Sequence, residues 1–96
     1  MRILVLSCAE AELAGAVDFY NTQRPGLGFE FAAEVKAAFR RVQEFPTAWP
    51  AFSERSRRCM VNRFPFGVLY QARADVVLVI AIMDLRRDPL VWAARG

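Results

Sequence analysis

The sequence predicts a two-layer α+β domain in which a helical hairpin packs on an antiparallel β-sheet. Three observations point to this fold. The length of 96 residues suits a single domain over residues 1–96. Two segments with helical periodicity come early in the chain, and three segments rich in β-branched and aromatic residues follow them. We therefore expect the order β-α-α-β-β-β.

The first half of the chain supplies the helical layer. Residues 2–7 are apolar, as in a short strand, and Ser7 is a candidate N-cap for a helix over residues 9–23. Pro25-Gly26 ends that helix with a sharp turn. The next helix ends at Pro46 and has the strongest periodicity in the sequence. Its apolar stripe consists of Phe31, Val35, Ala38, Phe39, Val42 and Phe45.

The second half supplies the sheet. After a loop over residues 46–56 we expect strands at 57–64, 66–73 and 76–83, with Pro65 between the first two. Ala74-Asp75 is a two-residue hairpin connection between the second and third. Both alternating sets of residues in 76–83 are apolar, so this strand needs cover on both faces. Because the hairpin covers only one, the C-terminal segment with Trp92 or a second protein must cover the other.

Composition excludes several kinds of chemistry. The chain has no histidine, the commonest general base and metal ligand, and Cys8 lies far from Cys59. We therefore expect no metal site, no cofactor and reduced cysteines, as in a cytoplasmic protein. The apolar run from Ile3 to Leu6 is too short for an export signal. Residues 76–83 are too few to span a bilayer, which needs about 20, so we expect no membrane partner.

Basic charge is concentrated in the second half of the chain and is almost entirely arginine. Lys36 is the one lysine among 13 basic residues, and residues 51–96 carry eight basic and four acidic groups. Three groups stand out: Arg57-Arg58, Arg63 and Arg86-Arg87. If they converge at one concave edge of the sheet, they would hold a nucleic-acid backbone or an acidic protein segment. The alternative is a set of edge-strand charges and local ion pairs.

Several segments together resemble the RelE/ParE toxin family, also known as plasmid stabilisation proteins. They follow in order and with matching spacing over nearly the whole chain. These segments are Glu12-Leu13, 16–20, 23–31, Phe45-Pro46, Arg57-Arg58, 63–70, and 86–89 with Trp92. The resemblance implies a small bacterial type II toxin, encoded beside its antitoxin, with two helices over an antiparallel sheet.

Activities differ within this family, and a comparison of individual residues indicates which activity to expect of this chain. RelE-like members are ribosome-dependent mRNA endoribonucleases, whereas ParE-like members poison DNA gyrase. The resemblance implies that Arg58, Arg63 and Arg86 are basic cleft residues, catalytic only in a ribonuclease. This chain has Asp84 where close relatives commonly carry histidine, and Val91 where many carry tyrosine. Since arginine stays protonated and Asp84 beside Arg86 should have a lowered pKa, the chain lacks an efficient base.

We therefore expect the toxin component of a type II toxin–antitoxin system, which inhibits growth until its antitoxin neutralises it and acts on DNA gyrase or otherwise without catalysis. Two alternatives stay open: a ribosome-dependent mRNA endoribonuclease, and a degenerate family member that acts as a structural partner. The residues expected to bind the target are Arg57, Arg58, Arg63, Arg86, Arg87 and Trp92. Those expected to bind the antitoxin, on the uncovered sheet face, are Val77, Val79 and Met83.

Overall fold

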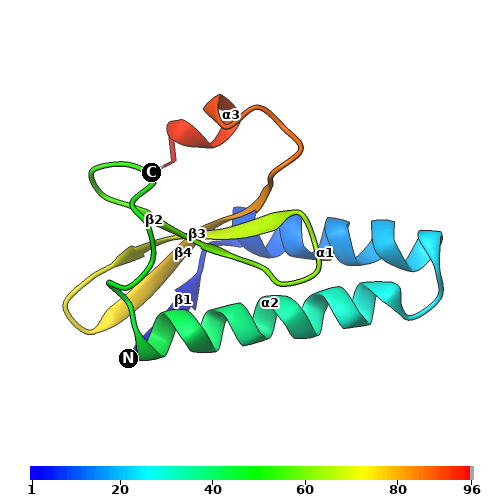
Figure 1. Ribbon diagram of the computed structural model, residues 1–96, viewed down its shortest axis with the longest axis horizontal. Helices are drawn as coiled ribbons and strands as arrows, with labels where there is room; N and C mark the ends of the chain where they lie inside the picture. Colours follow the sequence, from blue (N-terminus) through cyan, green and yellow to red (C-terminus); the bar gives the residue numbers. More distant parts are fainter. Residues whose placement is uncertain (96) are drawn as a thin grey trace.

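Two long helices pack against one face of a four-stranded sheet in the computed structural model, which describes residues 1–95 (Figure 1). The elements are β1 (Arg2–Val5), α1 (Ser7–Gln23), α2 (Leu27–Glu44), β2 (Arg57–Met60), β3 (Phe66–Ala72), β4 (Val76–Asp84) and α3 (Leu90–Ala93). The strand order is β1-β4-β3-β2. Strands β2, β3 and β4 are antiparallel, and β1 joins β4 in parallel. The predicted α+β two-layer architecture is confirmed, with a short α3 added above the second face of the sheet.

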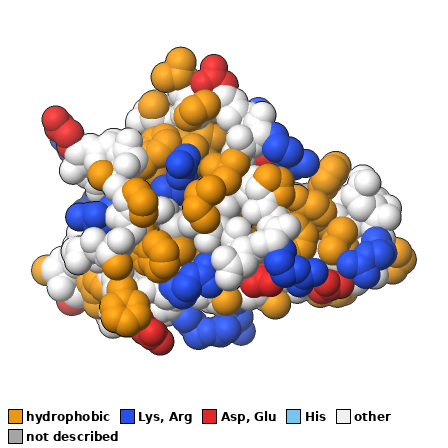
Figure 2. Space-filling model, viewed as in Figure 1, with side chains coloured by type: hydrophobic (Ala, Val, Ile, Leu, Met, Phe, Trp, Pro, Cys, Tyr) orange, Lys and Arg blue, Asp and Glu red, His pale blue; other side chains and the backbone are white. Residues whose placement is uncertain are grey.

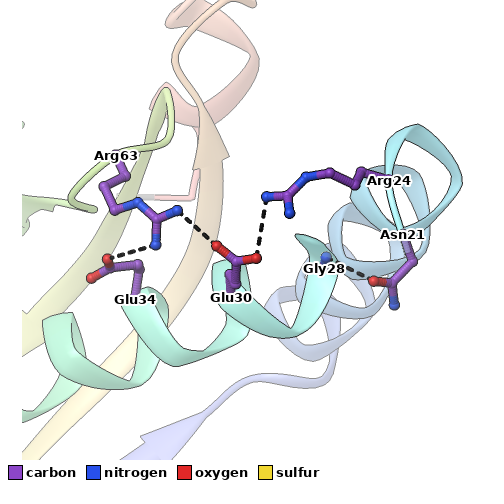
Figure 3. Close-up of polar contacts among 6 residues, drawn as sticks. All are labelled: Asn21, Arg24, Gly28, Glu30, Glu34 and Arg63. Atoms are coloured by element: carbon purple, nitrogen blue, oxygen red, sulfur yellow. Dashed lines mark hydrogen bonds and ion pairs between the residues drawn. The ribbon is translucent and has the colours of Figure 1, made fainter. Parts of the chain in front are cut away.

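Two glycines allow α1 and α2 to meet in a tight turn. Gly26 has φ +87°, a left-handed conformation that favours glycine. Gly28 lies against α1, where an added Cβ would overlap the carbonyl oxygen of Val17. Its N–H donates to Asn21 Oδ1 at 2.8 Å (Figure 3). The helices can therefore approach closely at this end of the hairpin.

Several element boundaries differ from the sequence prediction. Strand β1 ends at Val5 and not at residue 7. Helix α1 begins at Ser7 itself, and its N-cap is Leu6, which provides no side-chain hydrogen bond. Strand β2 ends at Met60 because the chain turns back early, with Val61 N–H donating to Phe66 C=O at 2.9 Å. Arg63 adopts φ 71° within this turn. The turn between β2 and β3 is therefore longer than Pro65 alone indicates.

The main core lies between the helices and the sheet. The α2 stripe buries Phe31, Val35 and Val42 in a core shared with residues of α1, β3 and β4. Aromatic rings fill the end nearest the hairpin turn: Phe31 meets Phe66 with 4.9 Å between ring centroids, and Tyr20 meets Phe64 at the same distance. Both pairs have the edge-to-face geometry that aromatic quadrupoles prefer.

A β-bulge in β4 changes which side chains share a face. Leu69 pairs with Ala81 but Tyr70 pairs with Val79, which leaves Ile80 as the extra residue. Val77 and Val79 consequently belong to the core beneath α1 and α2, whereas Met83 lies on the opposite face.

This bulge corrects the prediction for the antitoxin-binding residues. Val77, Val79 and Met83 do not share an uncovered apolar face, because strict alternation stops at Ile80. None of the three is more than 1% exposed. An antitoxin cannot reach them without rearrangement of this chain.

The short helix α3 covers much of the second sheet face. Trp92 is 3% exposed and packs on Leu69, Ala81 and Met83. From the sequence, there were two possible covers for this face, the C-terminal segment or a second protein. The structure shows that the C-terminal segment covers it. On the β1 side of the same face, Leu4 remains 50% exposed.

We predict that Gly28→Ala destabilises the fold, because its methyl group would overlap α1. The expected loss in the free energy of unfolding is about 1–3 kcal/mol, the usual cost of overpacking. Gly15→Ala is the control, since a Cβ there meets nothing within 4 Å. This variant should gain up to about 1 kcal/mol from helix propensity. Equal urea midpoints for the two variants would contradict the close helix approach.

We predict that stability falls at alkaline pH because of Tyr70. Its hydroxyl donates to the carbonyl of Pro46 at 2.7 Å, and burial raises its pKa to about 12. An unfolded tyrosine has a pKa of about 10, so the stability contributed by the neutral phenol is complete below that pH and is lost as pH rises towards 12. Tyr70→Phe should flatten the alkaline part of a stability–pH curve measured by urea denaturation. An unchanged curve would exclude Tyr70 as its cause.

Candidate functional site

A cleft of about 320 Å³ lies between α1, the end of β4 and the C-terminal segment. The residues that line it are Glu12, Gly15, Ala16, Phe19, Phe66, Ile82, Asp84, Arg86, Arg87 and Trp92. It combines aromatic rings with guanidinium groups. Figure 2 shows hydrophobic side chains gathered on one face of the molecule, with basic side chains among them.

The cleft exists because β1 is shorter than β4. Strand β1 pairs only with residues 76–79, so the second half of β4 has no strand on that side among the described residues. Helix α1 follows β1 directly and runs along this free edge. Its residues Glu12, Gly15, Ala16 and Phe19 have the i, i+3, i+4, i+7 spacing of one helix face and line the cleft together.

Arg86 is held in place by Asp84. Its Nε donates to Asp84 Oδ1 and its Nη2 to Oδ2, both at 3.0 Å, and the Arg86 backbone N–H also donates to Oδ1. The guanidinium carbon lies 5.8 Å from the ring centroids of both Phe19 and Phe66. The hydrogen bonds from Arg86 lower the pKa of Asp84, as the sequence predicted. Asp84 is therefore ionised and a weak base at neutral pH.

Arg87 has a different setting. It forms no ion pair with any residue in the described part of the chain, and its guanidinium lies 6.0 Å from the Trp92 ring centroid. It is exposed at the rim of the cleft. Its charge is thus available to an anionic ligand.

Arg63 is bound to acidic side chains of α2. It donates to Glu30 at 2.8 Å and forms an ion pair with Glu34 at 3.5 Å (Figure 3). Arg24 reaches the same Glu30 carboxylate at 3.2 Å. The hydrogen bond from Arg63 lowers the pKa of Glu30. Arg63 therefore bridges the β2–β3 turn and α2.

Arg57 and Arg58 lie on β2, at the sheet edge opposite β1. Arg57 Nη1 donates to the Trp49 carbonyl at 2.7 Å. Arg58 lies 5.8 Å from the Phe52 ring centroid, with its aliphatic carbons near Gly67. Neither arginine lines the cleft.

The predicted convergence of all these arginines on one concave edge is therefore wrong. Arg86, Arg87 and Trp92 share the cleft, whereas Arg57, Arg58 and Arg63 do not line it. The physical reasons are that β3 separates β2 from β4, and that the α2 carboxylates hold Arg63.

Tyr20 is a residue whose relation to this site was missed from the sequence. Its ring packs in the core, yet its hydroxyl lies near Arg86 and Asp84, which both influence its ionisation. Burial raises its pKa, and the hydroxyl is buried with no hydrogen-bond partner among residues 1–95. The signal for this placement was its position four residues after Ala16, which puts both on one face of α1.

The arrangement favours binding of an anionic group over acid–base chemistry. Arg87 offers a positive charge and the exposed Phe19 offers aromatic surface, whereas Phe66 and Trp92 line the cleft but are almost fully buried. The Asp84 carboxylate is already occupied by Arg86. Within the described residues, no three cysteine or carboxylate side chains are grouped so that they could hold a metal ion. No helix in this part of the chain is long and apolar enough to cross a membrane.

Comparison with known proteins finds a solved structure with a similar fold. No protein-family model matches the chain, and no curated protein matches it. Among solved structures, it is similar to a chain described as "Chromosomal ParDE TA system from P. aeruginosa", with a TM-score of 0.79. The match covers 88% of this chain and 96% of that chain at 16% sequence identity. This chain has a ParDE-type fold. The fold implied by the RelE/ParE resemblance is thus confirmed.

We predict that Asp84→Asn weakens the acid dependence of stability. Because the Asp84 pKa is lowered, its contribution is present above the unfolded pKa of about 4 and is lost as pH falls through its folded value. Arg86 is half-exposed, so the loss at neutral pH should be about 1 kcal/mol or less. The control is Glu54→Gln, at an exposed loop position. Parallel acid unfolding curves for wild type and Asp84→Asn would contradict this role.

Proposed function

We propose that this chain is the toxin component of a type II toxin–antitoxin system. The observation that carries the proposal is the ParDE-type fold, shared over 88% of the chain with a protein of a toxin–antitoxin system. The same family was indicated independently by the order of short sequence segments. Its partner is a cognate antitoxin, and the pair acts in the cytoplasm.

The toxin acts by binding its target, and we propose DNA gyrase as that target. Support comes from the chemistry of the cleft, where the carboxylate of Asp84 is held by Arg86 and the Tyr20 hydroxyl is buried. Ribonucleolytic cleavage needs a base for the 2′-hydroxyl and an acid for the leaving oxygen. An exposed cation beside an aromatic ring, as at Arg87 and Trp92, instead suits recognition of an anionic surface.

We predict growth arrest when this chain is expressed alone from an inducible promoter in a bacterial host. Filamentation with intact mRNA is expected, and co-expression of the short open reading frame beside the gene should restore growth. Cuts in mRNA at codon-spaced positions, mapped by primer extension, would instead assign a ribosome-dependent endoribonuclease. Unimpaired growth with stable, folded protein would assign the structural-partner alternative.

Substitutions in the cleft should separate the arginines that act on the target from those that support the fold. Arg87→Ala removes a charge without an ion pair in the described chain, so toxicity should fall at least tenfold while thermal stability is unchanged. Arg86→Ala should abolish toxicity with a small loss of stability, because Asp84 loses its partner. Arg40→Ala, an exposed site on α2, is the control. Full toxicity of both cleft variants would remove the cleft from the mechanism.

A further inference from the structure

A second, smaller pocket lies in the loop that joins α2 to β2. Its volume is about 230 Å³, and it shares no lining residue with the cleft between α1 and β4. The residues that line it are Thr47, Ala51, Ser53, Glu54, Arg55, Ser56, Arg57 and Ala72. All of them except Ala72 come from residues 47–57, so one short segment of the chain forms most of the pocket. Its lining is largely polar, in contrast to the aromatic lining of the cleft.

Hydrogen bonds hold this segment in a compact turn. The Phe52 N–H donates to the Ser56 C=O at 2.9 Å. The Ser53 hydroxyl oxygen accepts from the backbone N–H groups of Arg55 and Ser56, both at 3.2 Å, as in a serine-based turn. Ser56 is only 2% exposed. The polar groups of the pocket are therefore positioned by the fold itself, which lowers the entropic cost of binding a ligand there.

Two guanidinium groups at this pocket have no carboxylate partner in the part of the chain that the structure describes. Arg57 Nη1 donates to the Trp49 C=O at 2.7 Å, which fixes the side chain without neutralising its charge. The Arg55 side chain forms no hydrogen bond or ion pair within residues 1–95. Both positive charges are therefore available to an anion.

The combination of groups in this pocket favours a small phosphate monoester that also carries a hydroxyl group. Guanidinium forks and hydroxyl donors suit phosphate oxygens, and Thr47 adds a hydroxyl beside the two arginines. The pocket is smaller than the range of about 300–1,000 Å³ that is typical of drug-sized ligands, so its ligand must be small. Glu54 would repel a bare phosphate, but its carboxylate can accept a hydrogen bond from a hydroxyl group of the same ligand.

We propose that this pocket binds a sugar phosphate. Arg55 and Arg57 hold the phosphate group, which carries nearly two negative charges at neutral pH, and Glu54 accepts a hydrogen bond from a sugar hydroxyl. Because the lining residues are distinct from those of the cleft, this site is separate from the proposed action on DNA gyrase. A bound ligand would join residues of the loop to one another and so stabilise the folded chain.

The test uses the full chain, with ribose 5-phosphate as the probe and inorganic phosphate and ribose as the comparators. Arg55→Gln removes a side chain that has no other partner among the described residues, so the variant should fold. Arg40→Gln is the matched control, since it removes the same charge from an exposed position on α2 outside the pocket. Glu54→Ala tests the hydroxyl contact. Affinity is measured by isothermal titration calorimetry, and the ligand is located by shifts of backbone amide NMR signals.

We expect ribose 5-phosphate to bind more tightly than inorganic phosphate, and ribose alone not to bind. Arg55→Gln should weaken binding about tenfold or more, the usual effect of losing a hydrogen bond to a charged group, whereas Arg40→Gln should leave it unchanged. Glu54→Ala should strengthen the binding of inorganic phosphate and abolish the preference for ribose 5-phosphate. The amide signals that shift should belong to residues 47–57 and to Ala72.

Four results would overturn the proposal, and none of them depends on whether the chain is toxic. The first is failure of the wild-type protein to bind ribose 5-phosphate at millimolar concentration. The second is equal affinity of this probe for wild type and Arg55→Gln, or signal shifts confined to the cleft. The third is equal affinity of the wild-type protein for inorganic phosphate and ribose 5-phosphate, which would leave an anion site without selectivity for the sugar. The fourth is displacement of ribose 5-phosphate by a six-nucleotide single-stranded RNA without terminal phosphates, which would assign the pocket to a nucleic-acid backbone.

Discussion

The short length of β1 is the constraint on which the candidate site depends. The chain leaves the sheet after Val5 and enters α1 at Ser7, and a hydrogen bond from Leu6 N–H to Val79 C=O at 3.0 Å is the last backbone contact between this segment and β4. Had β1 continued, a strand would occupy the space where the cleft now lies. The turn after β1 instead directs α1 along the half of β4 that β1 does not pair with. The early end of β1 therefore creates both the cleft and an incompletely paired strand.

Charge in this protein is mostly committed to the fold. Arg63 and Arg24 share the Glu30 carboxylate, and Arg86 is fixed by Asp84. Exposed ion pairs of this kind contribute little free energy each, because water screens them. Their effect is positional, since they fix the β2–β3 turn against α2 and hold the Arg86 guanidinium against aromatic rings. A net basic composition therefore does not indicate which positive charges are free to bind a ligand. The contacts of each arginine side chain determine this.

Much of the fold could be predicted from the sequence, because its signals are local. The stripe of α2, the Pro25-Gly26 turn and the apolar run of β4 each predict an element without knowledge of the rest. The candidate site was harder, since it depends on register. One bulge at Ile80 moves Met83 to the face opposite Val79, and no pattern in the apolar run 76–83 marks that position. The relation of Tyr20 to Arg86 likewise requires the packing of α1 on β4.

The Glu12–Arg95 ion pair links three parts of the molecule that are far apart in sequence. Glu12 belongs to α1, Arg95 follows α3, and both reach the β4 backbone, while the Arg95 guanidinium also lies 5.1 Å from the Trp92 ring centroid. Loss of this ion pair would remove one of the contacts that hold the residue after α3 against α1 and β4. Trp92 would still be retained by its own apolar contacts with Leu69 and Met83. Breaking the ion pair should therefore loosen the chain beyond Trp92, while α3 itself stays packed on the sheet.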